Sequence, residues 1–387
     1  MGSHGVGLGA GSAPAGLRRK AARWAAGGAA VAATAAAGLA AAPSAMAVAT
    51  IPVPCSVTAL NTAIAVAPSN SILVLVSGCV YRLTAPLPTI TRNLTINGSN
   101  DTITRFSGNY TILTNNGANV VLNNLRITNA FHSGPGAVAG AIFNTGGGSL
   151  SLTSVTMSGN TGPNGGAIYN NIFASLTVAS SSFIDNEATA GGIGGGGAIA
   201  NAGGNVTISS TTFLGNEASK GAGGAIGSLG GTVTLNGPSS SFTNNFAEED
   251  GGAIDATLGA LNVTKATFTG NNSDEDGGAI ANFGAAATIN NSGFTGNRAD
   301  DNGGAVATAS TLGLTSDTMS ANRAGDDGGG LFVLSGNITL NTTDIFGNRA
   351  GTTGGGIRRS GGNVSFLNTS LVELNFPNNC SGLICPF

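Results

Sequence analysis

The sequence predicts an all-β protein, a right-handed single-stranded parallel β-helix (solenoid) with a short N-terminal capping helix. The first observation is a repeat: an apolar residue just after one or more glycines recurs nine times, at intervals between 25 and 31 residues. Repeats of this length are typical of solenoids. The recurring residues are Ile142, Ile168, Ile199, Ile226, Ile254, Ile280, Val306, Leu331 and Ile357.

A second marker recurs in step with the first, an apolar residue three positions before an asparagine. A short alternating run such as Val206-Thr207-Ile208 lies between the two markers. Three period-2 runs separated by Gly, Asn, Ser and Asp predict three short strands and three turns in each unit. The marker pairs are Met157/Asn160, Phe183/Asn186, Phe213/Asn216, Phe242/Asn245, Phe268/Asn271, Phe294/Asn297, Met319/Asn322 and Ile345/Asn348.

One triplet of strands buries almost nothing, so the units must stack, with Ile on Ile and Phe on Phe. Parallel connections have one preferred hand, which predicts a right-handed coil. Stacking also explains the 64 glycines, which suit tight turns and close approach of coils. Asparagines at equivalent turns are expected to form hydrogen-bonded ladders along the stack.

The sequence divides into four segments. Residues 1–47 are expected to be a signal peptide, because Arg18, Arg19, Lys20 and Arg23 precede an alanine-rich run that ends in Ala45-Met46-Ala47. Residues 48–71 are expected to form an N-terminal cap with an amphipathic helix after Ser56, and residues 72–375 the β-helix repeats. Residues 376–387 are expected to form a disulfide-stapled tail.

Charge argues against several partners. Without residues 1–47, the chain holds 11 basic and 18 acidic residues, a net charge of −7, with no basic cluster. Nucleic acid and anionic lipid are therefore not expected as partners. No segment after residue 47 is apolar and long enough to span a bilayer. The sequence thus predicts a secreted, extracellular protein, with association with the cell surface left open.

Four cysteines lie near the two ends of this chain. In an exported protein they predict two disulfides, Cys55 to Cys79 and Cys380 to Cys385. The alternative is one zinc ion held by all four thiolates. This alternative would have to join opposite ends of the chain and lacks a paired CxxC spacing.

Acidic residues recur in the turn before the glycines. In the later coils Arg298, Arg323 and Arg349 follow the marker asparagines, which predicts a ladder of ion pairs. The two earlier loops lack such a cation, so calcium is the one cofactor that the sequence leaves open; the alternative is a solvated acidic face. The six candidate calcium ligands are Glu248, Glu249, Asp250, Asp274, Glu275 and Asp276.

The paired markers, GGA followed by Ile, Leu or Val and Phe-x-x-Asn, resemble the repeats of the chlamydial polymorphic membrane protein family. The resemblance covers roughly residues 140 to 375 and includes eight units with both markers. It implies a right-handed β-helix and a role like that of surface adhesins, with a host or cell-surface protein or glycan as the partner.

Catalysis is the competing prediction, since β-helices also carry pectate lyases and glycoside hydrolases. A hydrolase needs two carboxylates that converge on one outer face. Acids outside the stacked turn, such as Asp255, Asp344 and Glu373, fall in different phases of the repeat, so the sequence predicts no paired-acid face. We therefore predict a secreted, non-catalytic protein that binds cell surfaces, with no assigned catalytic residue; the alternative is a polysaccharide lyase or glycosidase.

Overall fold

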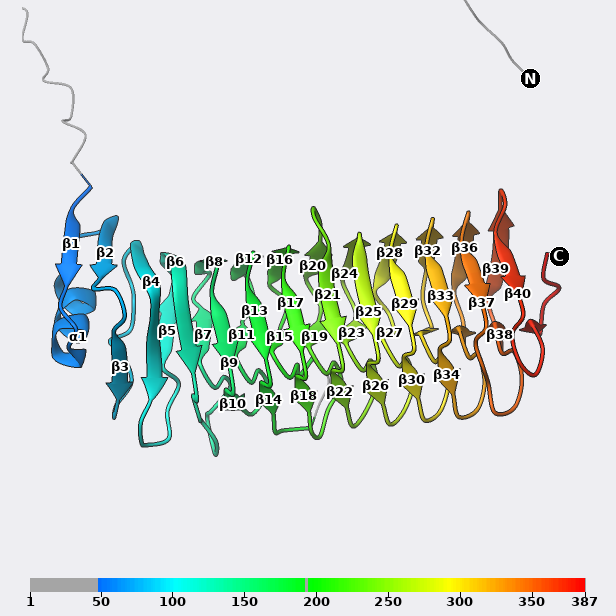
Figure 1. Ribbon diagram of the computed structural model, residues 1–387, viewed down its shortest axis with the longest axis horizontal. Coiled ribbons are helices and arrows are strands. Elements are labelled where there is room, and N and C mark those ends of the chain that lie inside the picture. Colours follow the sequence, from blue (N-terminus) through cyan, green and yellow to red (C-terminus); the bar gives the residue numbers. More distant parts are fainter. Residues whose placement is uncertain (1–47, 192–193, 387) are drawn as a thin grey trace, which may run out of the picture. The chain divides into compact units, whose positions relative to one another are not determined.

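A computed structural model of the chain describes residues 48–191 and 194–386. The predicted signal peptide lies outside these residues. The described chain winds into a parallel β-helix in which successive coils stack in a row, as Figure 1 shows from β1 to β40. One helix, α1 (Val57–Val66), lies near the N-terminal end of the row. The predicted fold class is confirmed.

Three sheets run along the stack and are named A, B and C below. Sheet A contains β1 (Thr50–Val53), β2 (Ser71–Leu75), β3 (Val80–Leu83), β4 (Leu94–Arg105), β6 (Asn119–Thr128), β8 (Ser149–Thr153), β9 (Thr156–Ser158), β12 (Ser175–Ala179), β13 (Ser182–Ile184), β16 (Asn205–Ser209), β17 (Thr212–Leu214), β20 (Thr232–Leu235), β21 (Ser240–Thr243), β24 (Ala260–Thr264), β25 (Ala266–Thr269), β28 (Ala286–Asn290), β29 (Gly293–Thr295), β32 (Leu312–Thr315), β33 (Thr318–Ser320), β36 (Asn337–Asn341), β37 (Asp344–Phe346), β39 (Asn363–Leu367) and β40 (Leu371–Glu373).

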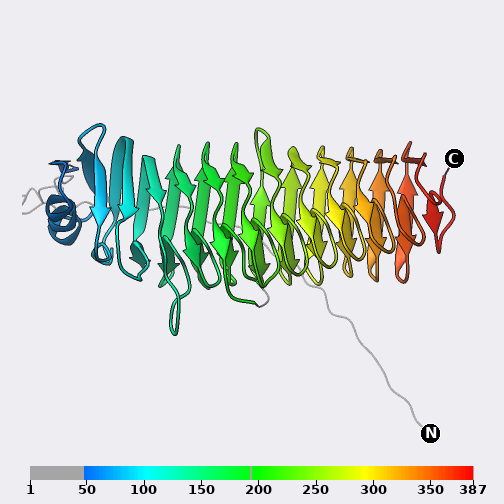
Figure 2. The same ribbon diagram turned by 60° about the horizontal axis from the view of Figure 1, so that its bottom comes forward.

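Sheets B and C are narrower, and Figure 2 shows the coils that link them to sheet A. Sheet B contains β5 (Leu113–Asn116), β7 (Ile142–Thr145), β11 (Ile168–Asn170), β15 (Ile199–Asn201), β19 (Ile226–Leu229), β23 (Ile254–Thr257), β27 (Ile280–Asn282), β31 (Val306–Thr308), β35 (Leu331–Val333), β38 (Ile357–Arg359) and β41 (Cys380–Ser381). Sheet C contains β10 (Thr161–Gly162), β14 (Glu187–Ala188), β18 (Glu217–Ala218), β22 (Phe246–Ala247), β26 (Asn272–Ser273), β30 (Arg298–Ala299) and β34 (Arg323–Ala324).

A regular coil has four strands, where the sequence predicted three. The coil that starts at β24 continues through β25 in the same sheet, β26 in sheet C and β27 in sheet B. Lys265, in the left-handed conformation with φ +56°, separates β24 from β25. The strand that the sequence did not predict is β26, because a two-residue strand is too short to show an alternating pattern.

The register places residues one unit apart side by side, as the repeat predicts. Phe242 pairs with Phe268, and Phe268 with Phe294, along sheet A. The rings of Phe183, Phe213, Phe242, Phe268 and Phe294 stack with centroids 4.6–5.0 Å apart. Together with the stacked Ile and Val residues of sheet B they form one continuous apolar core.

Buried asparagines form the predicted ladder beside the phenylalanine stack. Asn271 Nδ2 donates to Asn297 Oδ1 at 2.9 Å and to the Phe242 carbonyl at 3.0 Å. Its own Oδ1 accepts from the backbone N–H of Asn245 at 3.1 Å and from Asn245 Nδ2 at 2.9 Å. Each asparagine therefore joins its own coil to the coils before and after it, and the buried turn has its polar groups satisfied.

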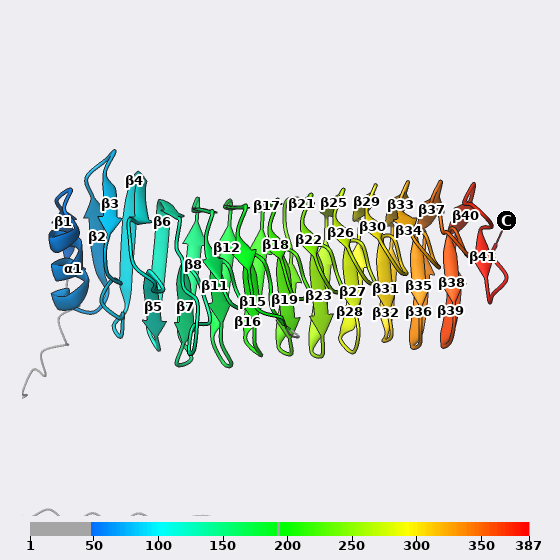
Figure 3. The ribbon, with the colours of Figure 1, turned by 90° about the horizontal axis from the view of Figure 1, so that it is seen from below.

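Helix α1 packs at the N-terminal end of the stack, where Figure 3 shows it beside β1 and β2. The Ser56 hydroxyl accepts from the Ala59 N–H and so caps the helix, and Leu60, Ala63 and Ile64 are buried against the core. This burial covers the end of the first coil, as a capping element of a solenoid must.

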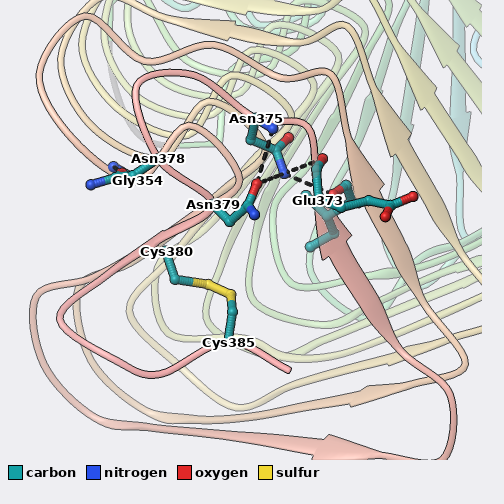
Figure 4. The surroundings of a disulfide bond; sticks show 8 residues. Gly354, Glu373, Asn375, Asn378, Asn379, Cys380 and Cys385 are labelled. Atoms are coloured by element: carbon teal, nitrogen blue, oxygen red, sulfur yellow. Dashed lines mark hydrogen bonds between the residues drawn. A yellow bond between two sulfur atoms is a disulfide. The ribbon is translucent and has the colours of Figure 1, made fainter. Parts of the chain in front are cut away.

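The two predicted disulfides are present, at opposite ends of the stack. Cys55 and Cys79, with Cα atoms 5.5 Å apart, join the cap to the first coils. Cys380 and Cys385, with Cα atoms 5.9 Å apart, staple the tail (Figure 4). The zinc alternative is wrong because all four thiols are paired. Strands also pair beyond the range 72–375 that the sequence predicted for the repeats, β1 with β2 and β38 with β41.

Candidate functional site

The acidic turn column is the first candidate site, and its third acid has a structural role. Asp250 Oδ1 accepts from the Asp276 N–H at 3.0 Å. Asp276 Oδ1 in turn accepts from the backbone N–H and side-chain amide of Asn302, both at 2.9 Å. Asn302 and Asp327 continue the same pattern to the last coils. These side chains therefore tie each turn to the next, and only two of the six predicted ligands belong to this ladder.

The remaining four candidate ligands, Glu248, Glu249, Asp274 and Glu275, lie nearer the surface of the same turns. Partial burial, together with the charges of neighbouring acids, raises the pKa values of Asp274 and Glu275. Burial raises the pKa of Asp250 to about 7, and the charges of Asp276, Glu275 and Glu249 add to it. The stacked acids thus repel one another, as like charges about 5 Å apart must.

Calcium at these two turns stays a prediction. In the part of the chain that the structure describes, no group of three or more His, Cys, Asp and Glu side chains is arranged to hold a metal ion. A calcium ion shared by the six acids is expected to raise the Tm, because an ion that binds only the folded state stabilises it. Thermal unfolding with and without millimolar Ca²⁺ tests this, and an unchanged Tm contradicts it.

The predicted ladder of ion pairs is wrong for two of its three arginines. Arg298 Nη2 lies 2.6 Å from Asp300 Oδ1, with both side chains about half exposed. The Arg349 guanidinium instead lies over the ring of Phe376, 4.9 Å from its centroid. The register explains why the ladder is incomplete. Arg298, Arg323 and Arg349 stack directly on one another in sheet C and its continuation, while the acids belong to the next turn.

Asp255 is a functional candidate that the sequence did not single out. It follows Ile254 in β23, and strand alternation directs it to the outer face of sheet B. Its side chain is nevertheless only 2% exposed. Its register neighbour Gly227 lies under the Gly195 carbonyl, where an added Cβ would be only 1.6 Å from the oxygen. The longest repeat interval, 31 residues, contains Gly195, so this extra length covers the outer face beside Asp255.

The environment of Asp255 favours its neutral form. Within the described residues its one hydrogen-bond partner is the Thr257 hydroxyl, at 3.3 and 3.4 Å from the two carboxyl oxygens. Burial, together with the charge of the nearby Asp250 carboxylate, raises the pKa of Asp255 to about 8. A buried acid that keeps its proton near neutral pH is a common feature of functional sites, although structural networks produce it as well.

A second candidate site lies on the outer face of sheet A, at the C-terminal end of the stack. A cavity of about 190 Å³ is lined there by Asp344 and Phe346 of β37 and by Leu371 and Glu373 of β40. The sequence predicted no paired-acid face, and this prediction is wrong: Asp344 and Glu373 share this cavity. They occupy different phases of the repeat but the same face, because positions i and i+2 of a strand point the same way.

A larger cavity of about 360 Å³ lies between α1 and residues 88–94. Ile64, Ala67, Pro88 and Ile90 contribute much of its lining. Arg92 reaches across it and donates from its guanidinium to the Ala65 carbonyl. This contact joins the cap to the first coils, which assigns the cavity to the packing of the cap.

One finding bears on membrane association: among the described residues, no helix is both long and apolar enough to cross a bilayer. The six acids of the column, the buried Asp255 and the cavity of β37 and β40 all belong to coils of the β-helix. The first two lie near sheets B and C and the third on sheet A, so they are separate sites.

Comparisons with known proteins agree with this architecture. The family model for the Chlamydia polymorphic membrane protein repeat matches residues 154–171, 239–257 and 265–282. A search of curated proteins found no match. Among solved structures, the chain is similar to tailspike protein 3 of bacteriophage CBA120, with 14% identity over 86% of this chain and 59% of that one and a TM-score of 0.37.

A second similar structure is the catalytic unit of a thermostable GH87 α-1,3-glucanase from Streptomyces thermodiastaticus strain HF3-3. It shares 13% identity over 85% of this chain and 66% of that one, with a TM-score of 0.47. The chain therefore spans 59% and 66% of these two structures, which are too distant to bear on its function. The chain is a parallel β-helix protein, and three of its segments match the Chlamydia polymorphic membrane protein repeat.

Proposed function

We propose that this protein is an extracellular or cell-surface binding protein that works in adhesion, with the outer face of sheet A as its contact surface. The observation that supports this proposal most directly is the composition of the outer face of sheet A. Its outward columns hold hydroxyl and amide side chains in one coil after another. One column runs through Ser151, Thr177, Thr207, Thr234, Asn262, Thr288, Gly313, Thr339 and Ser365.

Such a face suits a repetitive partner. Neighbouring coils place equivalent side chains about 5 Å apart, so a protein or glycan surface can make many weak hydrogen bonds at once. Simultaneous weak contacts add up to strong attachment, because each one after the first is intramolecular. The matched family model is described as that of a membrane protein repeat, and the disulfides fit an oxidising environment; both support a location outside the cell.

Adhesion of the full-length protein to cells and to immobilised glycans tests the proposal. Substituting Thr207→Arg and Thr234→Arg together puts two bulky charges on the proposed face. We expect at least a several-fold loss of adhesion with an unchanged Tm. Asn272→Arg on sheet C is the matched control, and it should leave adhesion unchanged. Adhesion of the unsubstituted protein no stronger than that of an unrelated protein contradicts the proposal.

One observation favours the competing function, a polysaccharide-active enzyme: Asp344 and Glu373 line the same cavity. Two carboxylates on opposite sides of a sugar can act as acid and base in glycoside hydrolysis. Incubation with neutral and acidic polysaccharides, followed by assays for reducing ends and unsaturated products, separates the two functions. Sustained turnover that disappears in the Asp344→Asn variant would replace the adhesion proposal by this one.

A further inference from the structure

The outward columns of sheet A change character in the last two coils. Each coil contributes two strands to sheet A, and the second of them has two outward positions. From β13 to β33, the first of these positions is occupied in turn by Ser182, Thr212, Ser241, Thr267, Gly293 and Thr318. In β37 and β40 the same column continues as Asp344 and Leu371. The parallel column holds Ile184 and Leu214 in β13 and β17 and hydroxyls from Thr243 to Ser320, and it continues as Phe346 and Glu373. The hydroxyl pattern thus ends where the 190 Å³ cavity lies.

The register arranges the four side chains as a checkerboard. Asp344 lies beside Leu371, and Phe346 lies beside Glu373. The two acids therefore occupy one diagonal of the square and the two apolar groups the other. A coil spacing of about 4.8 Å and a two-residue step of about 6.6 Å set the acids roughly 8 Å apart. Each acid thus flanks an apolar surface instead of repelling the other at close range.

All four groups are available to a ligand. Neither carboxylate makes a hydrogen bond or ion pair with any residue that the structure describes. In Figure 4 the Glu373 side chain points away from Asn375 and Asn379, and only its backbone carbonyl accepts from Asn375 Nδ2, at 2.8 Å. Phe346 is 40% exposed and Leu371 42% exposed. The Phe346 ring is thus partly open to solvent on a face that otherwise carries many hydroxyls.

We propose that this groove, Asp344, Phe346, Leu371 and Glu373, binds one ring of a neutral cell-surface glycan. The inference rests on the proposed adhesive function and names its ligand class. A pyranose has an apolar C–H face, which packs on an aromatic ring, and a rim of hydroxyls, which donate to carboxylates. Sugars with carboxylate or sulfate groups are repelled by the two acids. The volume is below that of a drug-sized pocket, about 300 Å³, so it suits one ring.

A cationic amine is the other ligand that two acids and a phenyl ring could attract. Isosteric amides separate the two cases. In the Asp344→Asn/Glu373→Gln variant the amide oxygens still accept hydrogen bonds from sugar hydroxyls, but the negative charge is gone. Glycan binding should weaken only a few-fold, because hydrogen bonds to charged groups are stronger than neutral ones. Amine binding should disappear.

The experiment measures Kd values of the full-length protein for neutral oligosaccharides, uronic-acid oligosaccharides and spermidine. The test variant is Phe346→Ala, and we expect it to weaken neutral-glycan binding about tenfold or more. The matched control is Phe173→Ala, between β11 and β12 and outside sheet A, where the side chain is 83% exposed. This control should leave the Kd unchanged, and unchanged Tm values should confirm that both variants fold.

Three outcomes would overturn the inference: no neutral glycan binds, Phe346→Ala binds as tightly as the unsubstituted protein, or only spermidine binds and the double amide variant loses it. Cell adhesion distinguishes this failure from that of the proposed function. Suppose that the Phe346→Ala variant adheres fully to cells while the Thr207→Arg/Thr234→Arg variant does not. Then the proposed glycan groove is wrong, and the proposed adhesive face is supported. If the unsubstituted protein does not adhere, the adhesive function is wrong.

Discussion

Replacing Asp255 by Asn is expected to raise the Tm at pH 8 and to leave it nearly unchanged at pH 4. The carboxyl of Asp255 is buried beside Asp250, and these surroundings raise its pKa from the usual 3.8 to about 8. Above pH 8 the folded protein must therefore carry a buried negative charge. Asparagine has the same shape without the charge, so it removes this cost while it can still accept from the Thr257 hydroxyl.

The direction of this pH dependence follows from the linkage between proton binding and folding. Between pH 4 and pH 8 the folded state holds a proton on Asp255 that the unfolded state has lost, so stability falls as the pH rises. The stability that protonated Asp255 contributes to the folded state is fully present below pH 4 and is lost by about pH 8. A pKa raised from 3.8 to about 8 corresponds to on the order of 6 kcal/mol across this interval, at about 1.4 kcal/mol per pH unit. Asp250 and Asp317, whose pKa values burial raises to about 7, act in the same direction.

Thermal unfolding of the two proteins from pH 4 to pH 8.5 checks this expectation. The curves of Tm against pH should coincide at the acid end and separate by several degrees at the alkaline end, with the Asn variant higher. Asp301→Asn, in an exposed turn, is the control and should follow the unsubstituted protein. A variant curve that runs parallel to that of the unsubstituted protein would show that Asp255 does not titrate in this range.

Removing Asn271 from the middle of the asparagine ladder is expected to cause the largest loss of stability. Asn271→Ala removes a hydrogen bond from four buried groups: the Phe242 carbonyl, Asn297 Oδ1, and the backbone and side-chain N–H donors of Asn245. Asn297 Oδ1 still accepts from the backbone N–H of residue 271, and Asn245 Nδ2 still donates to the Phe213 carbonyl. Each unmet buried group costs about 1–3 kcal/mol. We expect a loss on the order of 5 kcal/mol in the free energy of unfolding, partly reduced where neighbouring groups shift.

The adjacent residue gives a matched control. Asn272 is only half-buried in sheet C, and its side chain accepts one long hydrogen bond, 3.5 Å, from Arg298. Asn272→Ala should change the free energy of unfolding by less than about 0.5 kcal/mol, as is usual for surface substitutions. Chemical denaturation of the two variants measures the difference. Equal losses would mean that the ladder contributes no more than an ordinary surface asparagine.

The sequence was sufficient for the fold because its two markers recur at nearly constant intervals. An interval of 26 between Phe242 and Phe268 leaves few architectures other than a stack of coils, and the asparagine ladder follows from the same phase. The two-residue strands of sheet C were missed, since two residues carry no periodicity. In these strands the arginines stack on one another, and of the predicted ladder of ion pairs only the pair of Arg298 and Asp300 forms.

The candidate sites were harder to predict because they depend on neighbours that differ in phase or lie outside the regular repeat. Comparing acids at equal phase could not bring Asp344 and Glu373 together, since they are diagonal neighbours on one face. Asp255 looks exposed by strand alternation. Its side chain is buried beside Gly227, over which the Gly195 carbonyl of the longest unit lies, and repeat spacing alone does not show where such a segment lies.

Disulfide trapping between adjacent coils tests most directly that residues one repeat apart lie in register. Thr243, Thr269 and Thr295 occupy one outward column of sheet A in three successive coils. The Thr243→Cys/Thr269→Cys variant should form a disulfide under mild oxidation, because Cα atoms about 5 Å apart permit one. The Thr243→Cys/Thr295→Cys variant, with about 10 Å between Cα atoms, should remain reduced. Equal cross-linking of the two pairs, or none in the adjacent pair, would contradict the stacked register on which the ladder, the adhesive face and the groove all depend.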